Sequence, residues 1–551
     1  MIRRSFAPAV FFLASLAAGC VSAETDSALP DGEAGEATTA ASVAAGQPNI
    51  VLILLDDLDK VVTEPFYADV LPHVMALKEQ GVYFENAFAP TSICCAARAG
   101  ILSGKYGHNT DVLTNGGDQG GWAQFQDDEP FAVAARLSQA GYRTGAFGKY
   151  LNGFQVDGDG VPPAVPPGWT DWHVFVDSGV SYTGYNYLLQ HYSASTGAAP
   201  TVTQYGAAES DYSTDVLRDE ALSMIRSAEG EDDRPFFMYV TPTAPHLPLQ
   251  AAPRHQALAA QWTAGTFPTS RPNYYADGAT IEDKPAWLES TWDERSQAQT
   301  RAWNFADWKG RMGSLYAADE LVQSIVEELQ AKGEWDNTLL VFASDNGYNH
   351  GAHALLHKMA PYEESIRVPL LIAGGAALGL RKNVTETRTV THVDYFPTFL
   401  ELAGLTVPSD ADGRSLVPLI KQGAAPVSWR TDFLEQYAGS GAEDGIGLEI
   451  PAAYYTVAPA FVLDIPKYRA VRAQKTVYDN GAPRQTVLKL VEWYGDAEQG
   501  SIHEYEMYDL GKDPYELANV LHHEPLKYAA AAQSMKARLA ELQTCAGASC
   551  R

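Results

Sequence analysis

The sequence predicts an α/β fold, with a large mixed, mostly parallel sheet flanked by helices and a smaller C-terminal subdomain. Two observations predict it. Continuous apolar runs, the pattern of strands buried on both faces, alternate with helical patterns over most of the chain. Beyond about residue 425 the pattern changes to short strand-like pieces and one terminal helix, which is typical of an antiparallel sheet with a helix packed on it.

The N-terminus has the features of a secretory signal. Residues 1–4 are basic and residues 6–18 are apolar, a stretch too short to span a bilayer as a permanent helix. Cleavage fits before Cys20, in a segment that resembles a bacterial lipoprotein box, or after Ala23. We favour the first, with residues 1–20 as the signal and Cys20 as the lipidated residue. The sequence therefore predicts export to the periplasm or cell envelope through a lipid anchor, or secretion otherwise.

Residues 21–46 are rich in Ala, Gly, Thr and acidic side chains, and they predict a disordered acidic tether. Apart from Cys20, the cysteines form two close pairs along the chain. Cys545 and Cys550 close a short loop, and we expect a disulfide between them in an oxidising compartment. Cys94 and Cys95 are adjacent, where a disulfide is strained and rare, so they need another role.

The chain is strongly acidic, with 39 basic and 68 acidic residues and a formal net charge of −29. This balance argues against binding of nucleic acid and against a general attraction to polyanions. If the substrate is an anion, the few cations must be concentrated in a pocket.

Four predicted strands end in polar residues. The strands are residues 49–55, 142–147, 236–240 and 338–342, and they lead to Asp56-Asp57, Lys149, His246 and Asp345-Asn346. Helical patterns at 131–140, 214–227 and 314–332 stand between or before them. Because ligands of such sheets collect at the carboxyl ends of the strands, we expect these side chains to converge on one rim. Each segment alone is also typical of a turn.

Two long connections, residues 153–213 and 249–308, interrupt this alternation. Loops of this length inside a compact domain are usually functional. Their aromatic side chains suit stacking on sugar rings, and packing of the loops themselves is the alternative. The second connection carries Trp262, Tyr274, Tyr275, Trp287, Trp292, Trp303 and Trp308.

Cys94 lies where a short polar loop enters a predicted helix, and Arg98 follows four positions later on the same helical face. The helix N-terminus and the guanidinium both favour negative charge there, on a thiolate or on a bound oxyanion. The alternative is a buried structural cysteine followed by a surface arginine.

Asp56, Asp57, Asp345 and Asn346 offer three carboxylates and an amide oxygen, with no imidazole or thiolate among them. This set suits Ca²⁺, or Mg²⁺, far better than Zn²⁺. Cationic side chains would then surround an anion held against the metal. They are Arg98, Lys105, Lys149, His246 and Lys358.

These residues, in this order, resemble the formylglycine-dependent sulfatases of the alkaline-phosphatase-like superfamily, and most of all the N-acetylglucosamine-6-sulfatase type. The resemblance runs from about residue 47 to the end of the chain. We place a catalytic domain at 47–425 and the C-terminal subdomain at 426–551. The matching segments are 49–57, 94–108, 147–152, 244–248, 344–348, 358–369, 393–398 and 508–517.

The resemblance implies that a maturation enzyme oxidises Cys94 to formylglycine (3-oxoalanine), whose hydrated aldehyde attacks sulfur and then expels sulfate. Modified Cys94 joins Asp56, Asp57, Asp345 and Asn346 in binding the cation. Arg98 and Lys149 hold the formylglycine and the sulfate. His246 and Lys358 reach the bridging oxygen, and we favour His246 as the acid that protonates the leaving alcohol.

Two departures from the family pattern stand out. Leu151 occupies a position where many sulfatases have histidine, so we expect Asn152, or else His108, to bind substrate in its place, together with Lys105. The family's usual Cys-x-Pro-Ser-Arg is here Cys-Cys-Ala-Ala-Arg. Ala96 and Ala97 therefore bear on the efficiency with which Cys94 is converted.

The expected substrate is a sulfate ester of a carbohydrate, such as N-acetylglucosamine 6-sulfate or another glycan sulfate. An arylsulfatase and a phosphate or phosphonate ester hydrolase of the same superfamily are the enzymatic alternatives. A third is a non-catalytic protein that binds sulfated glycans through the same pocket while Cys94 stays a thiol.

Overall fold

The computed structural model describes residues 46–228, 234–274, 282–291, 294–424, 428–439, 465–495 and 503–551. The predicted signal with Cys20, the tether up to residue 45 and the domain boundary near residue 425 lie outside the described residues. None of the helices in the described ranges is both long and apolar enough to cross a membrane.

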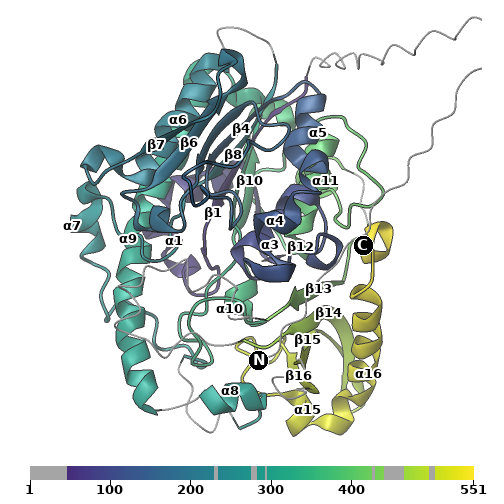
Figure 1. Cartoon of the computed structure of the whole chain (residues 1–551). Helices are drawn as coiled ribbons and strands as arrows, with labels where there is room; N and C mark the ends of the chain where they lie inside the picture. Colours follow the sequence, from purple (N-terminus) through teal and green to yellow (C-terminus); the bar gives the residue numbers. More distant parts are fainter. Residues whose placement is uncertain are drawn as a thin grey trace, which may run out of the picture. The chain divides into compact units, whose positions relative to one another are not determined.

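The large sheet has ten strands in the order β11-β2-β10-β9-β1-β8-β4-β5-β6-β7 (Figure 1). The central strands from β9 to β5 run parallel, and antiparallel neighbours flank them on both sides. The strands are β1 (Asn49–Leu55), β2 (Gly81–Phe84), β4 (Arg143–Gly148), β5 (Asp171–Phe175), β6 (Leu188–Ser193), β7 (Thr201–Gln204), β8 (Phe236–Thr241), β9 (Thr338–Ser344), β10 (Leu370–Gly374) and β11 (Val384–Glu386).

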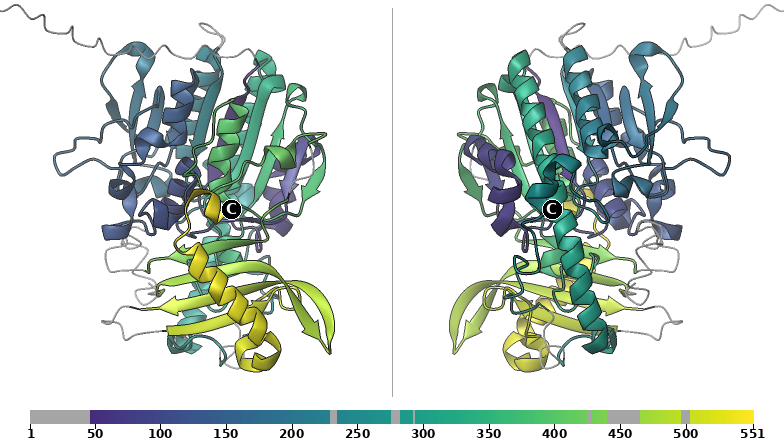
Figure 2. Two further views of the ribbon diagram at one scale, coloured as in Figure 1. Left: turned by 90° about the vertical axis from the view of Figure 1, so that its right-hand side faces the viewer. Right: turned by 90° about the vertical axis from the view of Figure 1, so that its left-hand side faces the viewer.

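Helices cover both faces of this sheet (Figure 2). Every residue of β1 is buried: Ile50, Leu52 and Leu54 pack into one core, and the side chains between them pack into the other. This two-sided burial explains the continuous apolar run. One core receives α3 (Cys94–Ser103), α5 (Val133–Gln139) and α11 (Tyr395–Leu402), and the other receives α2 (Pro72–Leu77), α6 (Ser213–Ala228) and α9 (Glu294–Lys332).

The predicted helices at 131–140 and 214–227 are confirmed as α5 and α6. The third prediction, 314–332, is too short, because α9 begins at Glu294. Polar residues dominate its first turns, so no apolar stripe marked them as helical. The connection at 153–213 likewise contains the strands β5 to β7.

The tryptophans of the second long connection belong to the scaffold where the structure describes them. Trp262, Trp287 and Trp308 are all buried, and Trp262 and Trp308 pack edge to face against Phe66. Packing of the loop, the alternative to sugar stacking, therefore accounts for these three. Tyr275, Trp292 and the side chain of Trp303 lie outside the described residues.

The C-terminal part forms a four-stranded sheet in the order β13-β14-β15-β16, antiparallel throughout. Its strands are β13 (Asp432–Tyr437), β14 (Tyr468–Asp479), β15 (Ala482–Tyr494) and β16 (His503–Asp509). Helix α16 (Pro525–Leu542) packs on it through Met535 and Leu539, against Leu488 and Leu490. The predicted fold class is thereby confirmed for both parts of the chain.

Shorter elements complete the described fold. They are α1 (Tyr67–Val70), α4 (Gly121–Phe125), α7 (Gln256–Ala259), α8 (Ala286–Thr291), α10 (Glu363–Ile366), α12 (Val417–Ile420) and α15 (Val520–His523), with β3 (Ala87–Phe88) paired to β12 (Val390–Thr391).

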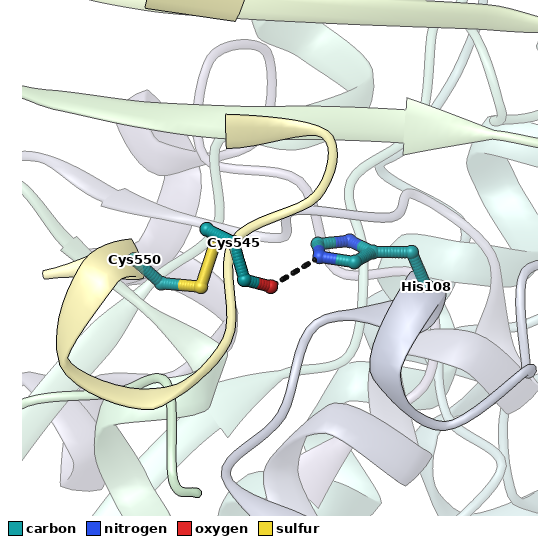
Figure 3. Close-up of side chains that lie close together, drawn as sticks. All are labelled: His108, Cys545 and Cys550. Atoms are coloured by element: carbon teal, nitrogen blue, oxygen red, sulfur yellow. Dashed lines mark hydrogen bonds between the residues drawn. A yellow bond between two sulfur atoms is a disulfide. The ribbon is translucent and has the colours of Figure 1, made fainter. Parts of the chain in front are cut away.

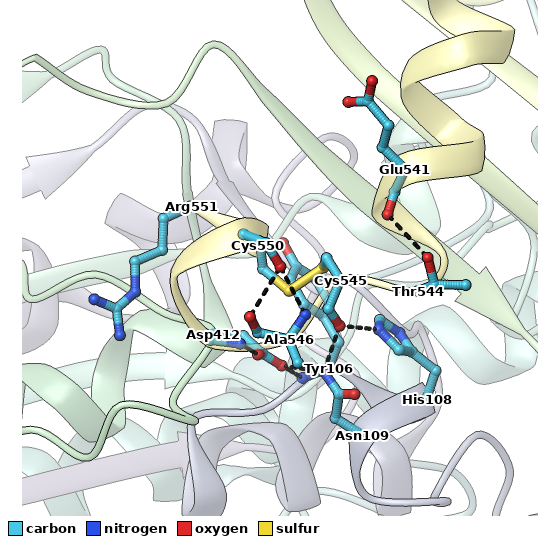
Figure 4. Close-up of a disulfide and its surroundings, with 12 residues drawn as sticks. Tyr106, His108, Asn109, Asp412, Glu541, Thr544, Cys545, Ala546, Cys550 and Arg551 are labelled. Atoms are coloured by element: carbon cyan, nitrogen blue, oxygen red, sulfur yellow. Dashed lines mark hydrogen bonds between the residues drawn. A yellow bond between two sulfur atoms is a disulfide. The ribbon is translucent and has the colours of Figure 1, made fainter.

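Cys545 and Cys550 form the expected disulfide. Asp412 binds the loop that this disulfide closes. Its carboxylate accepts hydrogen bonds from Gly547 N at 2.6 Å and from Tyr106 N at 2.7 Å (Figure 4). The C-terminal loop is thus fastened to the segment that follows α3.

Candidate functional site

The polar residues at four strand ends come together at one rim of the sheet. Strands β9, β1, β8 and β4 are consecutive neighbours, so the residues that follow them share that rim. The backbone N–H of Asp57 donates to Asp345 Oδ1 at 3.1 Å, and that of Asp56 donates to the carbonyl of Ala244 at 3.0 Å. Asn346 Nδ2 reaches Asp57 Oδ1 at 2.6 Å.

Cys94 faces this acidic group from the first turn of α3. The helix begins after Ile93, whose backbone is extended, and ends at Gly104, which is left-handed with φ +73°. A side chain at Gly104 would collide with Phe396, so glycine is required there. Cys94 Sγ lies 3.4 Å from Asp56 Oδ1 and is fully buried.

Four cationic groups surround the carboxylates. Lys149 Nζ lies 2.8 Å from Asp56 Oδ2, and Arg98 pairs with Asp345 Oδ2 at 2.8 Å. Lys358 Nζ contacts both Asp57 Oδ1 at 2.6 Å and Cys94 Sγ at 2.7 Å. His246 Nε2 lies 3.7 Å from Asp57 Oδ2. All of them are buried, so the structure concentrates positive charge in one pocket of an acidic protein.

The cations control the ionisation of the carboxylates. Burial alone would raise the pKa of Asp56, but Lys149, His246, Arg98 and Lys358 together hold it well below its usual range. Burial alone would lower the pKa of the Lys149 amine, but Asp56 and Cys94 raise it well above its usual value, so the amine stays charged. Burial and the nearby Asp56 carboxylate raise the pKa of Asp345 to about 6.

The acidic group has the composition of a site for a hard cation. Asp56, Asp57, Asp345 and Asn346 offer carboxylate and amide oxygens, and potential ligand atoms of Asp56, Asp57, Cys94 and His246 all lie within 4.8 Å of one another. Asn346 Oδ1 is fully buried and has no hydrogen-bond partner among the described residues. A buried, unpartnered amide oxygen next to three carboxylates fits a Ca²⁺ or Mg²⁺ ligand.

His246 is held in place from two sides. Its Nδ1 donates to the carbonyl oxygen of Leu247, which leaves Nε2 facing Asp57. The ring of Tyr182 stacks on the imidazole at a centroid distance of 4.2 Å. The ammonium of Lys149 lies 4.8 Å from the centroid of the same tyrosine ring.

Sequence reasoning missed two residues that support the site. Tyr182 comes from the aromatic-rich connection at 153–213. The composition of this connection indicated that the loop is functional, but nothing singled out Tyr182 among its aromatic residues. Arg311, in α9, donates to the carbonyl of Asp57 and lies 4.0 Å from the centroid of the Tyr348 ring. Nothing in the pattern around Arg311 distinguishes it from other helical arginines.

A cavity of about 190 Å³ adjoins the site. Lys149, Asn152, Asp177 and Tyr182 are among the residues that line it. Asn152 therefore lies in the wall of a cavity that Lys149 also lines, and its contact with substrate stays a prediction.

Lys105 and His108 lie away from this group. Lys105 follows the C-terminal end of α3 and pairs with Asp128 at 3.1 Å and with Asp410. His108 Nε2 lies 2.9 Å from the carbonyl oxygen of Cys545, beside the disulfide (Figure 3). Gly104, where α3 ends, is ten residues after Cys94, about 15 Å along the helix axis, and Lys105 and His108 lie beyond it.

Cys95 faces away from Cys94, into the core beneath α3. Its backbone N–H donates to Asn115 Oδ1 at 2.9 Å. Burial raises the pKa of its thiol to about 12, so Cys95 is an unreactive structural residue.

Comparison with known proteins identifies similar chains. The family model described as Sulfatase matches residues 48–405. The human protein N-acetylglucosamine-6-sulfatase is 31% identical over 524 residues, which cover 92% of this chain and 87% of the human one. An arylsulfatase of Volvox carteri is 30% identical over 557 residues, 94% of this chain and 77% of its own.

A solved structure described as a complex with its substrate D-glucosamine-2-N,6-O-disulfate has the same fold. It superposes with a TM-score of 0.66 at 22% identity, and the match covers 90% of this chain and 97% of that one.

Proposed function

Because the chain belongs to the sulfatase family and is a sulfuric ester hydrolase, we propose that it hydrolyses sulfate esters of carbohydrates, with 6-sulfated N-acetylglucosamine as the leading candidate. The observation that carries the proposal is the place of Cys94. Its Sγ lies 3.4 Å from Asp56 Oδ1 and 2.7 Å from Lys358 Nζ, and Asp57 and His246 belong to the same cluster of potential metal ligands.

The reactive residue in this proposal is formylglycine, made from Cys94 by a maturation enzyme. When formed, its hydrate supplies two hydroxyl groups, one to attack sulfur and one to release the sulfate. Arg98 lies one helical turn after Cys94 in α3, and its guanidinium stabilises the negative charge that develops at residue 94. The burial of Cys94 excludes bulk water, which strengthens each of these charge contacts.

Ca²⁺ is the cation that we propose for the acidic group, held by Asp56, Asp57, Asp345 and Asn346. When bound, it supplies positive charge that holds and activates the nucleophilic oxygen. The cation would take over contacts that Lys149 and Lys358 make with the carboxylates, and would leave both ammonium groups free to bind sulfate oxygens.

His246 is proposed as the acid that protonates the leaving alcohol. The Leu247 carbonyl fixes Nδ1 as the protonated nitrogen, so Nε2 is the atom that exchanges a proton with the substrate. Stacking on Tyr182 fixes the plane of the ring. Lys358 is the other cation within reach of the bridging oxygen.

The carbohydrate preference rests on two observations. The human relative is named for the 6-sulfate of N-acetylglucosamine, and its match covers nearly the whole chain. The cavity beside Lys149 offers polar groups for a sugar ring, among them Asn152 and Asp177. These groups would orient the sugar while the cationic end holds its sulfate.

Mass spectrometry and substrate assays test the proposal together. The peptide containing Cys94 should carry the mass of formylglycine in active protein from the native host. Cys94→Ala should abolish sulfate release from 6-sulfated N-acetylglucosamine, whereas the matched variant Cys95→Ala should keep it, because Cys95 is directed into the core. A wholly unmodified thiol in active protein would disprove the formylglycine mechanism.

The alternatives give different outcomes in the same assays. Turnover confined to aryl sulfates would identify an arylsulfatase, and turnover confined to phosphate or phosphonate esters would reverse the proposal. Binding of sulfated glycans without turnover would identify a lectin-like protein.

We also propose that the protein is exported and anchored through Cys20. Relatives at lower coverage include an extracellular sulfatase of Drosophila melanogaster. Cell fractionation should find the protein in the envelope, and Cys20→Ser should release it from membranes without changing its specific activity.

A further inference from the structure

A second group of potential metal ligands lies towards the β7 edge of the sheet, in strands β5 and β6 and helix α6. His173 and His191 are directly opposite each other in the antiparallel pairing of β5 with β6. Cross-strand partners project from the same face of a sheet. Helix α6 covers that face and contributes Glu220.

The two imidazoles and the carboxylate lie close together, and each imidazole contacts a different oxygen of Glu220. His173 Nδ1 lies 3.0 Å from His191 Nδ1 and 3.3 Å from Glu220 Oε2. His191 Nδ1 lies 3.6 Å from Glu220 Oε1. A tetrahedral Zn²⁺ ion with ligands at about 2.0–2.1 Å separates neighbouring ligand atoms by roughly 3.3 Å. The distance between the two imidazole nitrogens, and that from each nitrogen to its carboxylate oxygen, are therefore close to the spacing of neighbouring ligands around one zinc ion.

We propose that His173, His191 and Glu220 bind a transition-metal ion of the Zn²⁺ class, with water from the adjoining cavity as the fourth ligand. Two imidazoles and one carboxylate favour such an ion over Ca²⁺. The acidic group around Asp57 has the opposite preference, so the two sites take different ions.

The protonation of the histidines supports this assignment. Burial and the nearby His191 lower the pKa of His173 to about 4, and burial lowers the pKa of His191. Both imidazoles are therefore neutral at pH 7 and carry a lone pair that a metal can use. Two neutral Nδ1 atoms at 3.0 Å need a proton or a cation between them, and a metal ion satisfies both together with the carboxylate.

The surroundings leave one coordination position open. A cavity of about 510 Å³ is lined by His173 and Glu220, and its wall includes Ser193 and Ser223. Arg143 also lines it, but its guanidinium is held by Asp171 at 2.8 Å. Water in this cavity can reach the ion, and the serine hydroxyls can accept hydrogen bonds from that water.

The metal would act as a cross-link. Strands β6 and β7 form the antiparallel edge of the sheet, and the ion would tie β5 and β6 to α6 across the side of the sheet. Because metal bound only to the folded state stabilises it, the expected effect is on unfolding rather than on sulfate hydrolysis.

Cobalt titration of the purified, Ca²⁺-saturated protein tests the proposal. One equivalent of Co²⁺ should give the visible absorption of a tetrahedral ion, Zn²⁺ should displace it, and Zn²⁺ alone should raise the unfolding temperature. His173→Ala and His191→Ala should lose the absorption and the Zn²⁺-dependent shift. Glu220→Gln keeps the shape of the side chain and should weaken Zn²⁺ binding at least tenfold.

The matched control is His503→Ala, which removes a histidine paired with a single carboxylate, Glu492, at 2.9 Å. It should keep both signals, and all of these variants should keep sulfatase activity. Absence of metal-dependent absorption and of a Zn²⁺ shift in the unaltered protein would overturn the proposal and leave a hydrogen-bonded histidine pair. Persistence of both signals in His173→Ala and in His191→Ala would overturn it equally.

Discussion

Replacement of His246 by alanine separates its proposed role as acid from a role in binding. In the structure Nδ1 is engaged by the Leu247 carbonyl, and Nε2 points into the reactive group. The residue is 4% exposed, so bulk water does not reach the position from which it would donate. General acid catalysis contributes about 10²–10⁴ in rate, which corresponds to about 3–5 kcal/mol of barrier.

The effect of His246→Ala should therefore depend on the leaving group. With a sugar 6-sulfate, whose alkoxide leaves poorly without a proton, kcat should fall by about 10²–10⁴. With 4-nitrophenyl sulfate the phenolate leaves without help, and the loss should be far smaller. Steady-state kinetics on both substrates measures the difference, after thermal unfolding has shown that the variant is folded.

Lys149→Met is the comparison variant. Lys149 contacts Asp56 and faces the cavity, and no role in protonating the alcohol is assigned to it. Its loss should lower turnover of both substrates to a similar extent. If His246→Ala also lowers both equally, the assignment of His246 as the acid is wrong, and Lys358→Met becomes the variant expected to show the leaving-group dependence.

Four further outcomes are expected. Burial raises the pKa of Glu435 from its ordinary value of 4.5 to about 7, with Lys489 opposing. Between these two pH values the unfolded chain has lost a proton that the folded protein keeps, so stability falls as pH rises from 4.5 to 7 and levels off above 7. Glu435→Gln should be more stable than the unaltered protein at pH 8 by up to about 3 kcal/mol, with the gap closing towards pH 4, in urea unfolding. Cys545→Ser with Cys550→Ser should lower stability by about 2 kcal/mol, and no change in unfolding would contradict the chain-entropy estimate. Chelation by EGTA should abolish activity and Ca²⁺ should restore it, with Asn346→Ala needing more Ca²⁺ for half-activation; activity in EGTA would refute the cation site. Ala96→Pro, in the first turn of α3 where proline is tolerated, should raise the formylglycine fraction measured by mass spectrometry, and an unchanged fraction would show that Ala96 does not limit conversion.

Local sequence patterns were sufficient to predict the central sheet and the residues at its rim. A strand buried on both faces must be apolar throughout, so Asn49–Leu55 and Thr338–Ser344 were recognisable without any knowledge of their neighbours. The polar residue that follows such a strand has to leave the core, which placed Asp56 and Asp345 at the rim. The start of α9 had no such signal, because its first turns are polar.

The residues that join the site from long connections could not be predicted in this way. Tyr182 reaches His246 only because the connection after β4 adds strands to the sheet and returns over the rim. Lys105 and His108 are the opposite case, because they were grouped with Cys94 on the basis of sequence proximity. They are close to Cys94 in sequence, but a helix carries them to its far end, where Asp128 and the Cys545 carbonyl bind them.

The sequence by itself determined the fold class, the rim residues of β1, β4, β8 and β9, and the Cys545–Cys550 pair, because each depends on burial or spacing within a few residues. The tertiary structure decided which cations contact which carboxylates and which aromatic ring supports His246. It alone brought His173, His191 and Glu220 to within 3.6 Å of one another. Contacts of that kind depend on strand register and on the packing of a helix over it, and these are set by the whole chain.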